Sequence, residues 1–456
     1  MQQSLLAVNF GEIFGNLYEA MGFVQGKDWQ NYVMLLISFV LMYLAIVKKF
    51  EPMLLLPIAF GMFLINVPGA EGVLWGKYDY KVTDVVLLEN GNYLFAQTGE
   101  LLTPKFAEGS GLLEALLNAD GETILTPVFN DANEIIKYIA KTNYDLVTPE
   151  TRGLLWYLYF GVDKVIYPPL IFLGIGAMTD FGPLIANPKS MLIGAGAQLG
   201  IFIAFILASL IGFSAASAAA IAIIGGADGP TAIMVTSKLS PDLIPAIAIA
   251  AYSYMALIPI IQKPLMRLLT TKKERAIRMK PLRQVSKLEK ILFPVVVTLV
   301  VGIILPDSIT LLGMLMLGNL LKESGVVDRL STQAQNGLMN TITIFLGISV
   351  GCKAKGHVFL SVETLAIIAI GLFAFVMGTI GGLLVAKLMS KLTKGQINPL
   401  IGSAGVSAVP MAARISEDVG REYDPQNHLL MHAMGPNVAG VIGSAIAAGV
   451  LLACFG

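Results

Sequence analysis

Two apolar stretches of the chain are each interrupted in the middle by glycine, proline and polar residues. The first, residues 215–238, contains Gly-Gly-Ala-Asp-Gly-Pro at 225–230, and the second, residues 397–415, contains Gly-Ser-Ala-Gly-Val-Ser at 402–407 and a proline at 410. A broken helix in lipid leaves backbone groups unpaired at a cost of several kcal/mol each, unless they face protein or line a cavity. A pair of such breaks in corresponding positions of two halves indicates the binding site of a transporter.

The rest of the sequence is typical of a polytopic membrane protein. The chain has 456 residues, of which 55% are hydrophobic and 14% charged, and its mean hydropathy is +0.72. Soluble domains carry about 25% charged residues. Several apolar runs reach the roughly 20 residues that cross a bilayer, so we expect a multi-pass protein of the cell (inner or plasma) membrane. The sequence contains no nucleic-acid-binding motif, and we expect no nucleic-acid partner.

Charge divides the chain into four parts. Residues 1–30 are expected to lie on the membrane surface, and residues 31–262 form the first membrane repeat. An insertion at 68–151, with five lysines against thirteen acidic residues, is expected outside the membrane on the external side. Residues 263–290 contain ten lysines and arginines against two glutamates and read as a cytoplasmic linker. Residues 291–456 form the second membrane repeat.

Topology and internal similarity predict two halves of opposite orientation. The expected crossings are 31–48, 52–68, 154–178, 190–213 and 244–262 in the first half, and 290–305, 308–322, 334–351, 364–390 and 429–454 in the second. Ile171–Ile175 matches Ile344–Ile348, and Ile224-Gly225 matches Ile401-Gly402. If each interrupted stretch returns to its own side, each half has five crossings and the second half is inverted. Counting the stretches as full crossings puts Lys48-Lys49 and the basic linker on opposite sides, which the charges oppose.

The predicted fold is therefore an all-α membrane protein resembling an elevator transporter. Each inverted repeat holds about five crossings and one re-entrant or broken hairpin, and the two hairpin tips meet near the middle of the membrane. Helix ends at such breaks offer carbonyls to a cation and amides to a carboxylate.

Two acidic residues are candidates for a cation site, and each has a structural alternative. Asp180 follows a predicted crossing, where it is either a solvated carboxylate at a helix end or a sodium ligand or proton carrier. Lys353 occupies the repeat-related position. Asp228, at the first hairpin tip, either forms a turn or supplies a carboxylate at membrane depth.

Neutral and basic side chains complete the candidate set. Asn398, Ser403, Ser407 and Asn437 supply oxygens that suit a cation together, although helix-to-helix hydrogen bonding explains any one of them alone. Arg414 is either a cytoplasmic anchor or a fork for a carboxylate. His428 and His432 share a helical face without a third ligand in reach, and the two cysteines match no metal-ligand spacing, so we expect no transition-metal site.

Long specific strings resemble the membrane-embedded beta subunit of the sodium-pumping biotin-dependent decarboxylases, which act on oxaloacetate, methylmalonyl-CoA, glutaconyl-CoA or malonate. The resemblance covers both halves from about residue 155 onward and is carried by residues 172–187, 219–233, 251–259, 398–414 and 430–443. A tyrosine that the family often has in the fourth crossing is not matched, because residues 201–210 read Ile-Phe-Ile-Ala-Phe-Ile-Leu-Ala-Ser-Leu.

The resemblance implies a membrane subunit that decarboxylates carboxybiotin, exports sodium and consumes a proton. It implies biotin on a carboxyltransferase/biotin-carrier subunit, a small membrane subunit as a further partner, and a homo-oligomer within the complex. The family's sodium and coupling positions fall on Asp180, Asn398, Gly402, Ser407, Arg414 and Asn437. Of these, Arg414, Asp180 and Ser407 are the expected catalytic set, and Arg414 is expected to hold the carboxylate of carboxybiotin.

The inverted repeats and paired hairpins alone would equally suit a sodium-coupled secondary transporter of a small carboxylate. Which acid or acyl-CoA is decarboxylated does not follow from these residues, because that chemistry belongs to another subunit.

Overall fold

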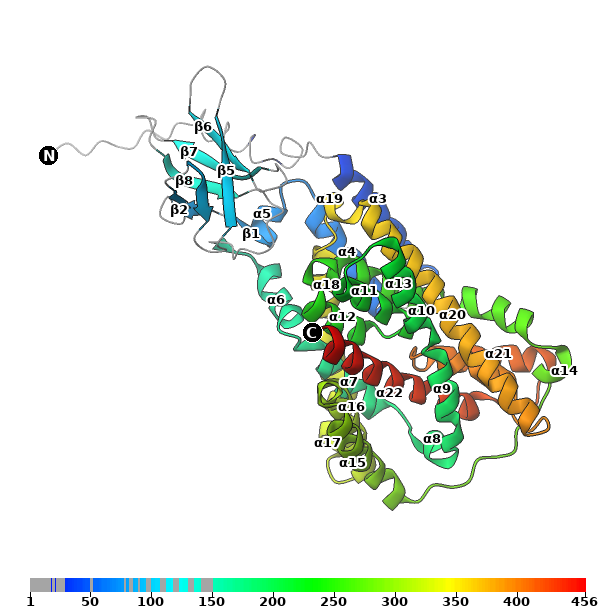
Figure 1. Ribbon diagram of the computed structural model, residues 1–456. Coiled ribbons are helices and arrows are strands. Elements are labelled where there is room, and N and C mark those ends of the chain that lie inside the picture. Colours follow the sequence, from blue (N-terminus) through cyan, green and yellow to red (C-terminus); the bar gives the residue numbers. More distant parts are fainter. Residues whose placement is uncertain are drawn as a thin grey trace. The chain divides into compact units, whose positions relative to one another are not determined.

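The computed structural model describes residues 29–49, 52–77, 79–81, 85–88, 91–95, 100–106, 112–117, 123–129, 135–140 and 151–456, together with Tyr18 and Met21. The surface segment expected at residues 1–30 lies almost entirely outside the described residues. The chain divides into two compact units, one of residues 1–27 and 68–157 and the other of residues 28–67 and 158–456. Figure 1 labels the elements of both.

The first unit is built on an antiparallel sheet, so the expectation of an all-α chain is wrong for this section. Seven strands pair in the order β2-β8-β7-β6-β5-β4-β3, namely β2 (Asp79–Lys81), β3 (Val85–Leu87), β4 (Tyr93–Phe95), β5 (Glu100–Phe106), β6 (Leu113–Leu117), β7 (Thr123–Phe129) and β8 (Ile135–Ala140). The short helix α5 (Glu71–Leu74) and the pair β1 (Gly76–Lys77) and β9 (Thr151–Arg152) complete it. Leu102, Leu116 and Leu125, from three neighbouring strands, are fully buried. Short runs of β-branched and aromatic residues form half-buried strands. This strand pattern is weak in the sequence beside the long apolar runs of the helical unit.

The second unit is helical, as predicted, although residues 154–157 at the start of α6 (Leu154–Asp163) belong to the first unit. Its longer helices are α3 (Trp29–Ile46), α4 (Pro52–Asn66), α6 (Leu154–Asp163), α7 (Tyr167–Met178), α9 (Met191–Ala197), α10 (Leu199–Ile211), α11 (Ala215–Ala222), α12 (Gly229–Leu239), α13 (Ile244–Leu269), α15 (Lys287–Ile304), α16 (Ile309–Ser324), α18 (Met339–Cys352), α20 (Val362–Leu392), α21 (Met411–Tyr423) and α22 (Leu430–Phe455). The shorter ones are α8 (Gly182–Ala186), α14 (Lys272–Arg275), α17 (Asp328–Gln333), α19 (Gly356–Phe359), η2 (Pro188–Ser190), η3 (Ile223–Gly226), η4 (Pro241–Leu243), η5 (Pro306–Ser308), η6 (Ala334–Leu338) and η7 (Pro399–Gly405).

Several of these helices can cross a membrane. Among the described residues, four are long and apolar enough, and the number is six if each of two sharply bent pairs counts as one span. One bent pair, α6 and α7, meets at 69° where a single crossing at 154–178 was expected. Pro168 and Pro169 start α7, and proline is tolerated at a helix start but not inside. The chain is a helical membrane protein.

The same helix crossing occurs twice in this unit. Helix α4 packs on α18, and α16 packs on α7. A Cβ added at Gly351 would lie 2.1 Å from the Ile58 carbonyl oxygen, and one added at Gly176 would lie 1.9 Å from the Leu315 carbonyl oxygen. Gly61 and Gly318 approach the Ile348 and Leu173 carbonyls in the same way. Each crossing therefore depends on one glycine from each of its two helices, which lets the two backbones touch.

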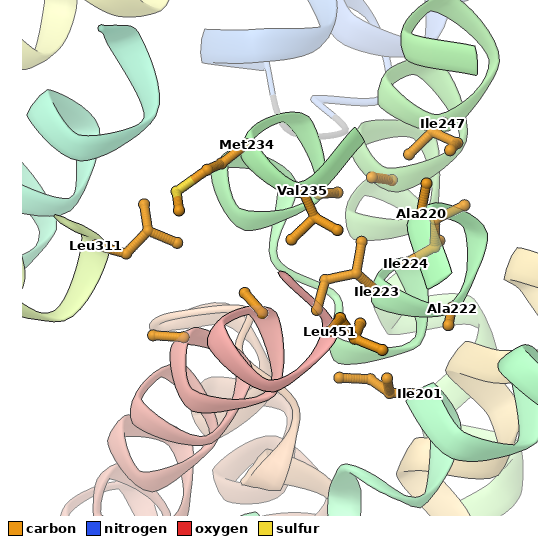
Figure 2. Close-up of a cluster of buried hydrophobic side chains, with 14 of the residues drawn as sticks. Ile201, Ala220, Ala222, Ile223, Ile224, Met234, Val235, Ile247, Leu311 and Leu451 are labelled. Atoms are coloured by element: carbon orange, nitrogen blue, oxygen red, sulfur yellow. The ribbon is translucent and has the colours of Figure 1, made fainter. Parts of the chain in front are cut away.

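The first interrupted stretch folds back on itself. Helix α11 runs into η3, the chain turns through Ala227 in the left-handed region (φ 55°), and α12 returns. Ser217 lies near the start of α11, and Ser240 directly follows the end of α12. Their hydroxyl oxygens are 3.1 Å apart. Figure 2 shows Ile223 and Val235 of this hairpin near Leu451 of α22. We call this segment, residues 215–240, the first hairpin.

The second interrupted stretch also returns to its starting point. Asn398 precedes η7 and donates from Nδ2 to the carbonyls of Arg275 (3.0 Å) and Ile277 (2.8 Å) in the basic linker. Asp424 follows α21 and accepts from Nη2 of Arg278 at 2.9 Å. Both ends therefore contact residues 275–278. We call residues 398–424 the second hairpin.

The tips of the two hairpins meet. The first hairpin ends where α13 begins, and the second contacts the linker that follows the other end of α13. The amide of Ser407 donates to the Gly226 carbonyl at 3.1 Å and so joins the two broken segments directly. Each tip also lies against a long helix, where Gly225 contacts Gly200 of α10 and Gly402 contacts Gly382 of α20. Figure 1 shows α20 beside α9 and α10, with which it packs.

The two glycine crossings predict that a single methyl group destabilises the helical unit. Gly176→Ala and Gly351→Ala each place Cβ against backbone, and such overpacking costs typically about 1–3 kcal/mol. We expect both variants to lower the thermal midpoint of the purified chain. Gly313→Ala is the matched control, because the nearest atom to its added Cβ is 3.7 Å away and alanine is the better helix former. Unchanged midpoints in both crossing variants would contradict this account.

The contacts of Asn398 predict a change in linker mobility. Asn398→Ala removes two hydrogen bonds to linker carbonyls, each worth about 1 kcal/mol net. We expect faster amide hydrogen exchange at residues 272–280, measured by mass spectrometry. The control Asn66→Ala also removes a buried amide that donates to two carbonyls, those of Met62 and Ala354, and should leave the linker unchanged. Equal linker exchange in both variants would show that Asn398 does not anchor it.

Candidate functional site

One face of α22 touches both hairpin tips. Asn437 donates from Nδ2 to the carbonyls of Ala404 (2.9 Å) and Val406 (2.8 Å) in the second hairpin. Ser444, seven residues later, donates from Oγ to Oδ2 of Asp228 in the first hairpin at 2.7 Å. Residues seven apart lie on the same helical face, so one face of α22 contacts both tips.

Asp228 is the carboxylate of this region. Its Oδ1 accepts from the Thr231 amide at 3.3 Å and caps α12, while its Oδ2 accepts from Ser444. The residue is only 5% exposed. Within the described part of the chain it has no ion pair. A buried carboxylate without a positive partner is strongly unfavourable unless it takes up a cation or a proton.

Ser407 and Asn437, which join these tips, each carry an unpartnered oxygen. Oγ of Ser407 and Oδ1 of Asn437 are buried and lack a hydrogen-bond partner among the described residues. The Ser407 backbone is nevertheless fixed by the Gly226 carbonyl, and the Asn437 amide group by the second hairpin. Polar atoms buried in this way are rare and need an explanation. We call Asp228, Ser407, Asn437 and Ser444 the tip cluster.

Two other predicted residues shape the second hairpin. The side chain of Asn398 is fully used, since Oδ1 accepts from the Leu400 amide at 3.0 Å while Nδ2 holds the linker. Gly402 has no room for a side chain, because an added Cβ would lie 2.4 Å from the Gly382 carbonyl oxygen. Both residues therefore set the position of the hairpin.

Asp180 lies in a different environment from the tip cluster. It follows α7, accepts from the Gly182 amide at 2.9 Å and pairs with Lys290 at 3.5 Å. Its side chain is 41% exposed, and Lys290 also pairs with Glu323. Asp180 is therefore a half-exposed carboxylate at a helix end with a cationic partner.

Arg414 is an exposed cation of the second hairpin. It lies on α21, seven residues beyond Ser407, and is exposed while Ser407 is buried. The same helix contacts the basic linker, where Arg267 pairs with Glu422 at 2.7 Å. Arg278 holds the pKa of Asp424 below its ordinary value, so this pair stays ionised near neutral pH. The linker and the C-terminal end of α21 therefore form one charged surface.

Sequence reasoning missed Ser444 and weighed Asp228 evenly with its turn-forming role. The helical spacing of seven from Asn437 could have identified Ser444 as a residue on the same face. The described residues contain no group of three or more His, Cys, Asp or Glu that could hold a metal ion. The tip cluster instead combines one carboxylate with neutral oxygens, a donor set that suits a hard cation.

Comparison with known proteins identifies the family of this chain. Residues 30–455 match the family model described as Na+-transporting oxaloacetate decarboxylase beta subunit. The chain is 52% identical to the methylmalonyl-CoA decarboxylase subunit beta of Propionigenium modestum over 444 residues, covering 97% of this chain and 98% of the relative. It is 52% identical to oxaloacetate decarboxylase beta chain 2 of Salmonella typhi over 453 residues, with the same coverage. Identity to the glutaconyl-CoA decarboxylase subunit beta of Acidaminococcus fermentans is 49% over 435 residues, 95% of this chain and 96% of the relative. The chain belongs to the family of beta subunits of sodium-transporting decarboxylases.

Proposed function

We propose that this chain is the membrane subunit of a primary sodium pump that decarboxylates carboxybiotin and exports sodium with consumption of a proton. The observation that carries the proposal is the buried carboxylate of Asp228 at the meeting point of two broken hairpins, without a cationic partner among the described residues. Family membership supplies sodium as the transported ion.

The tip cluster offers sodium a replacement for its water shell. Asp228 supplies the charge, while Ser407 Oγ and Asn437 Oδ1 supply neutral oxygens that are otherwise unpartnered in the described structure. Asn398 and Gly402 act indirectly, by fixing the second hairpin against the linker and α20. In this proposal Asp228 takes the role that the resemblance gave to Asp180.

Two inverted repeats provide a route between the two sides of the membrane. The repeated glycine crossing supports this arrangement, as does the place of the hairpins along the chain, since the first precedes the start of α13 and the second contacts the linker that follows its end. Movement of the hairpin-bearing helices against the others would expose the tip cluster to each side in turn, as in an elevator transporter.

Carboxybiotin would reach the cytoplasmic surface on a carrier domain of the partner carboxyltransferase subunit. The Arg414 guanidinium is exposed and can hold a carboxylate bidentately. Cleavage of the bond between carbon and the biotin ring nitrogen releases CO2 and leaves the electron pair on nitrogen, which then takes a proton. A small membrane subunit and further copies of this chain would complete the complex in the cell membrane.

Coupling follows from one carboxylate that binds either sodium or a proton. A proton on Asp228 neutralises the charge and weakens sodium binding, because the remaining ligands are neutral. Delivery of that proton to the biotin nitrogen would restore the carboxylate for the next sodium ion.

The experiment is sodium uptake into proteoliposomes that contain this chain with its partner subunits. Oxaloacetate, methylmalonyl-CoA and glutaconyl-CoA are tested in turn as the driving substrate, because the relatives carry these three names. We expect one of them to drive ²²Na+ uptake that avidin abolishes. Asp228→Asn should abolish both uptake and decarboxylation, whereas Asp180→Asn should retain both.

Two results would contradict the proposal. Uptake of a small dicarboxylate with sodium by this chain alone, without any biotin protein, would identify a secondary transporter. Loss of pumping in Asp180→Asn with full activity in Asp228→Asn would place the essential carboxylate on Asp180 instead of at the tip cluster.

A further inference from the structure

The turn between α9 and α10 places another buried side chain beside the hairpin tips. Gln198 separates the two helices and is only 7% exposed. Its Nε2 lies 3.2 Å from the Gly194 carbonyl oxygen and 3.3 Å from that of Gly440 on α22. Its Oε1 is buried and has no hydrogen-bond partner in the described part of the chain.

The orientation of this amide is fixed by its neighbours. Two carbonyl oxygens require a donor, so the NH2 group must face them and the oxygen must face away. Gly443 leaves room for the amide, since an added Cβ there would lie 2.8 Å from Nε2. The Gln198 side chain is therefore held in one position by two carbonyl acceptors, in space that the lack of a side chain at Gly443 leaves open.

The free oxygen lies near Gly226 at the tip of the first hairpin. A Cβ built on Gly226 would lie 3.8 Å from Gln198 Oε1 and 3.3 Å from Ser444 Cβ. Ser444 in turn donates to Asp228 at 2.7 Å, and the Gly226 carbonyl accepts from Ser407. Gln198 and Asp228 thus lie around the same short backbone segment at the tip of the first hairpin.

We infer that Gln198 is an additional sodium ligand of the tip cluster, with Oε1 as the coordinating atom; this rests on the proposed function. An amide oxygen stays neutral and binds a metal cation without binding a proton. Gln198 therefore favours sodium over a proton at the shared site, while Asp228 binds either. The residue belongs to neither hairpin, so it also couples ion occupancy to the contact of the first hairpin with α10.

The test is sodium-dependent thermal stabilisation of the purified full-length chain, with choline replacing sodium at constant ionic strength. Gln198→Leu removes the oxygen and should raise the sodium concentration for half-maximal stabilisation about tenfold, the effect of about 1.4 kcal/mol of binding energy. Gly443→Ala keeps the glutamine but displaces its amide, and should shift the midpoint in the same direction. Asn66→Leu is the matched control, because Asn66 is also a buried amide with two carbonyl acceptors and an unpartnered oxygen.

A sodium midpoint within twofold of wild type in both Gln198→Leu and Gly443→Ala would overturn the inference. The variant Asp228→Asn separates this outcome from failure of the proposed function. If Asp228→Asn alone loses stabilisation by sodium, the tip cluster stands and Gln198 is not a ligand. If Asp228→Asn keeps it, the sodium site itself is elsewhere.

Discussion

Backbone groups released by a broken helix inside a membrane must find partners in the protein, and this structure satisfies them by bringing two breaks together. The Ser407 amide donates to the Gly226 carbonyl, so the second hairpin supplies a backbone donor and the first supplies its acceptor. Asn437 adds donors to two carbonyls of the second hairpin. Neither tip could be buried alone without leaving polar backbone unpaired in an apolar environment, and the polar character of the site follows from this requirement.

Helix α22 contacts both hairpin tips and fixes the positions of the polar groups around them. Its residues 437, 440 and 444 lie on one face and reach the second hairpin, the α9–α10 turn and the first hairpin respectively. Glycine at 440 allows this closeness, because an added Cβ would lie 2.2 Å from the Gly405 carbonyl oxygen. Close backbone contact and a few fixed oxygens therefore arise from the same short stretch of sequence. A rigid helix carrying these groups positions ligands better than a loop would.

Much of this arrangement could be predicted from the sequence. Hydropathy indicated the helical membrane unit, and the Gly, Asp and Pro residues at 225–230 and 402–410 marked the two breaks. Family resemblance correctly gave the class of protein. The sheet at residues 79–140 was not predicted, because its strands are short and their pairing is set by contacts distant in the sequence. The structure brings some of the residues expected at the site together and leaves others apart. Ser407 and Asn437 lie at the tips, but Asp180 is half exposed beside Lys290, and sequence alone could not rank it against Asp228.

The most direct measurement is a density map of the complete complex in saturating sodium, compared with a map in sodium-free buffer. The account predicts a sodium-dependent peak enclosed by Asp228, Ser407 and Asn437, with the two hairpin tips in contact. A peak beside Asp180, or hairpins whose tips lie apart in water, would contradict it.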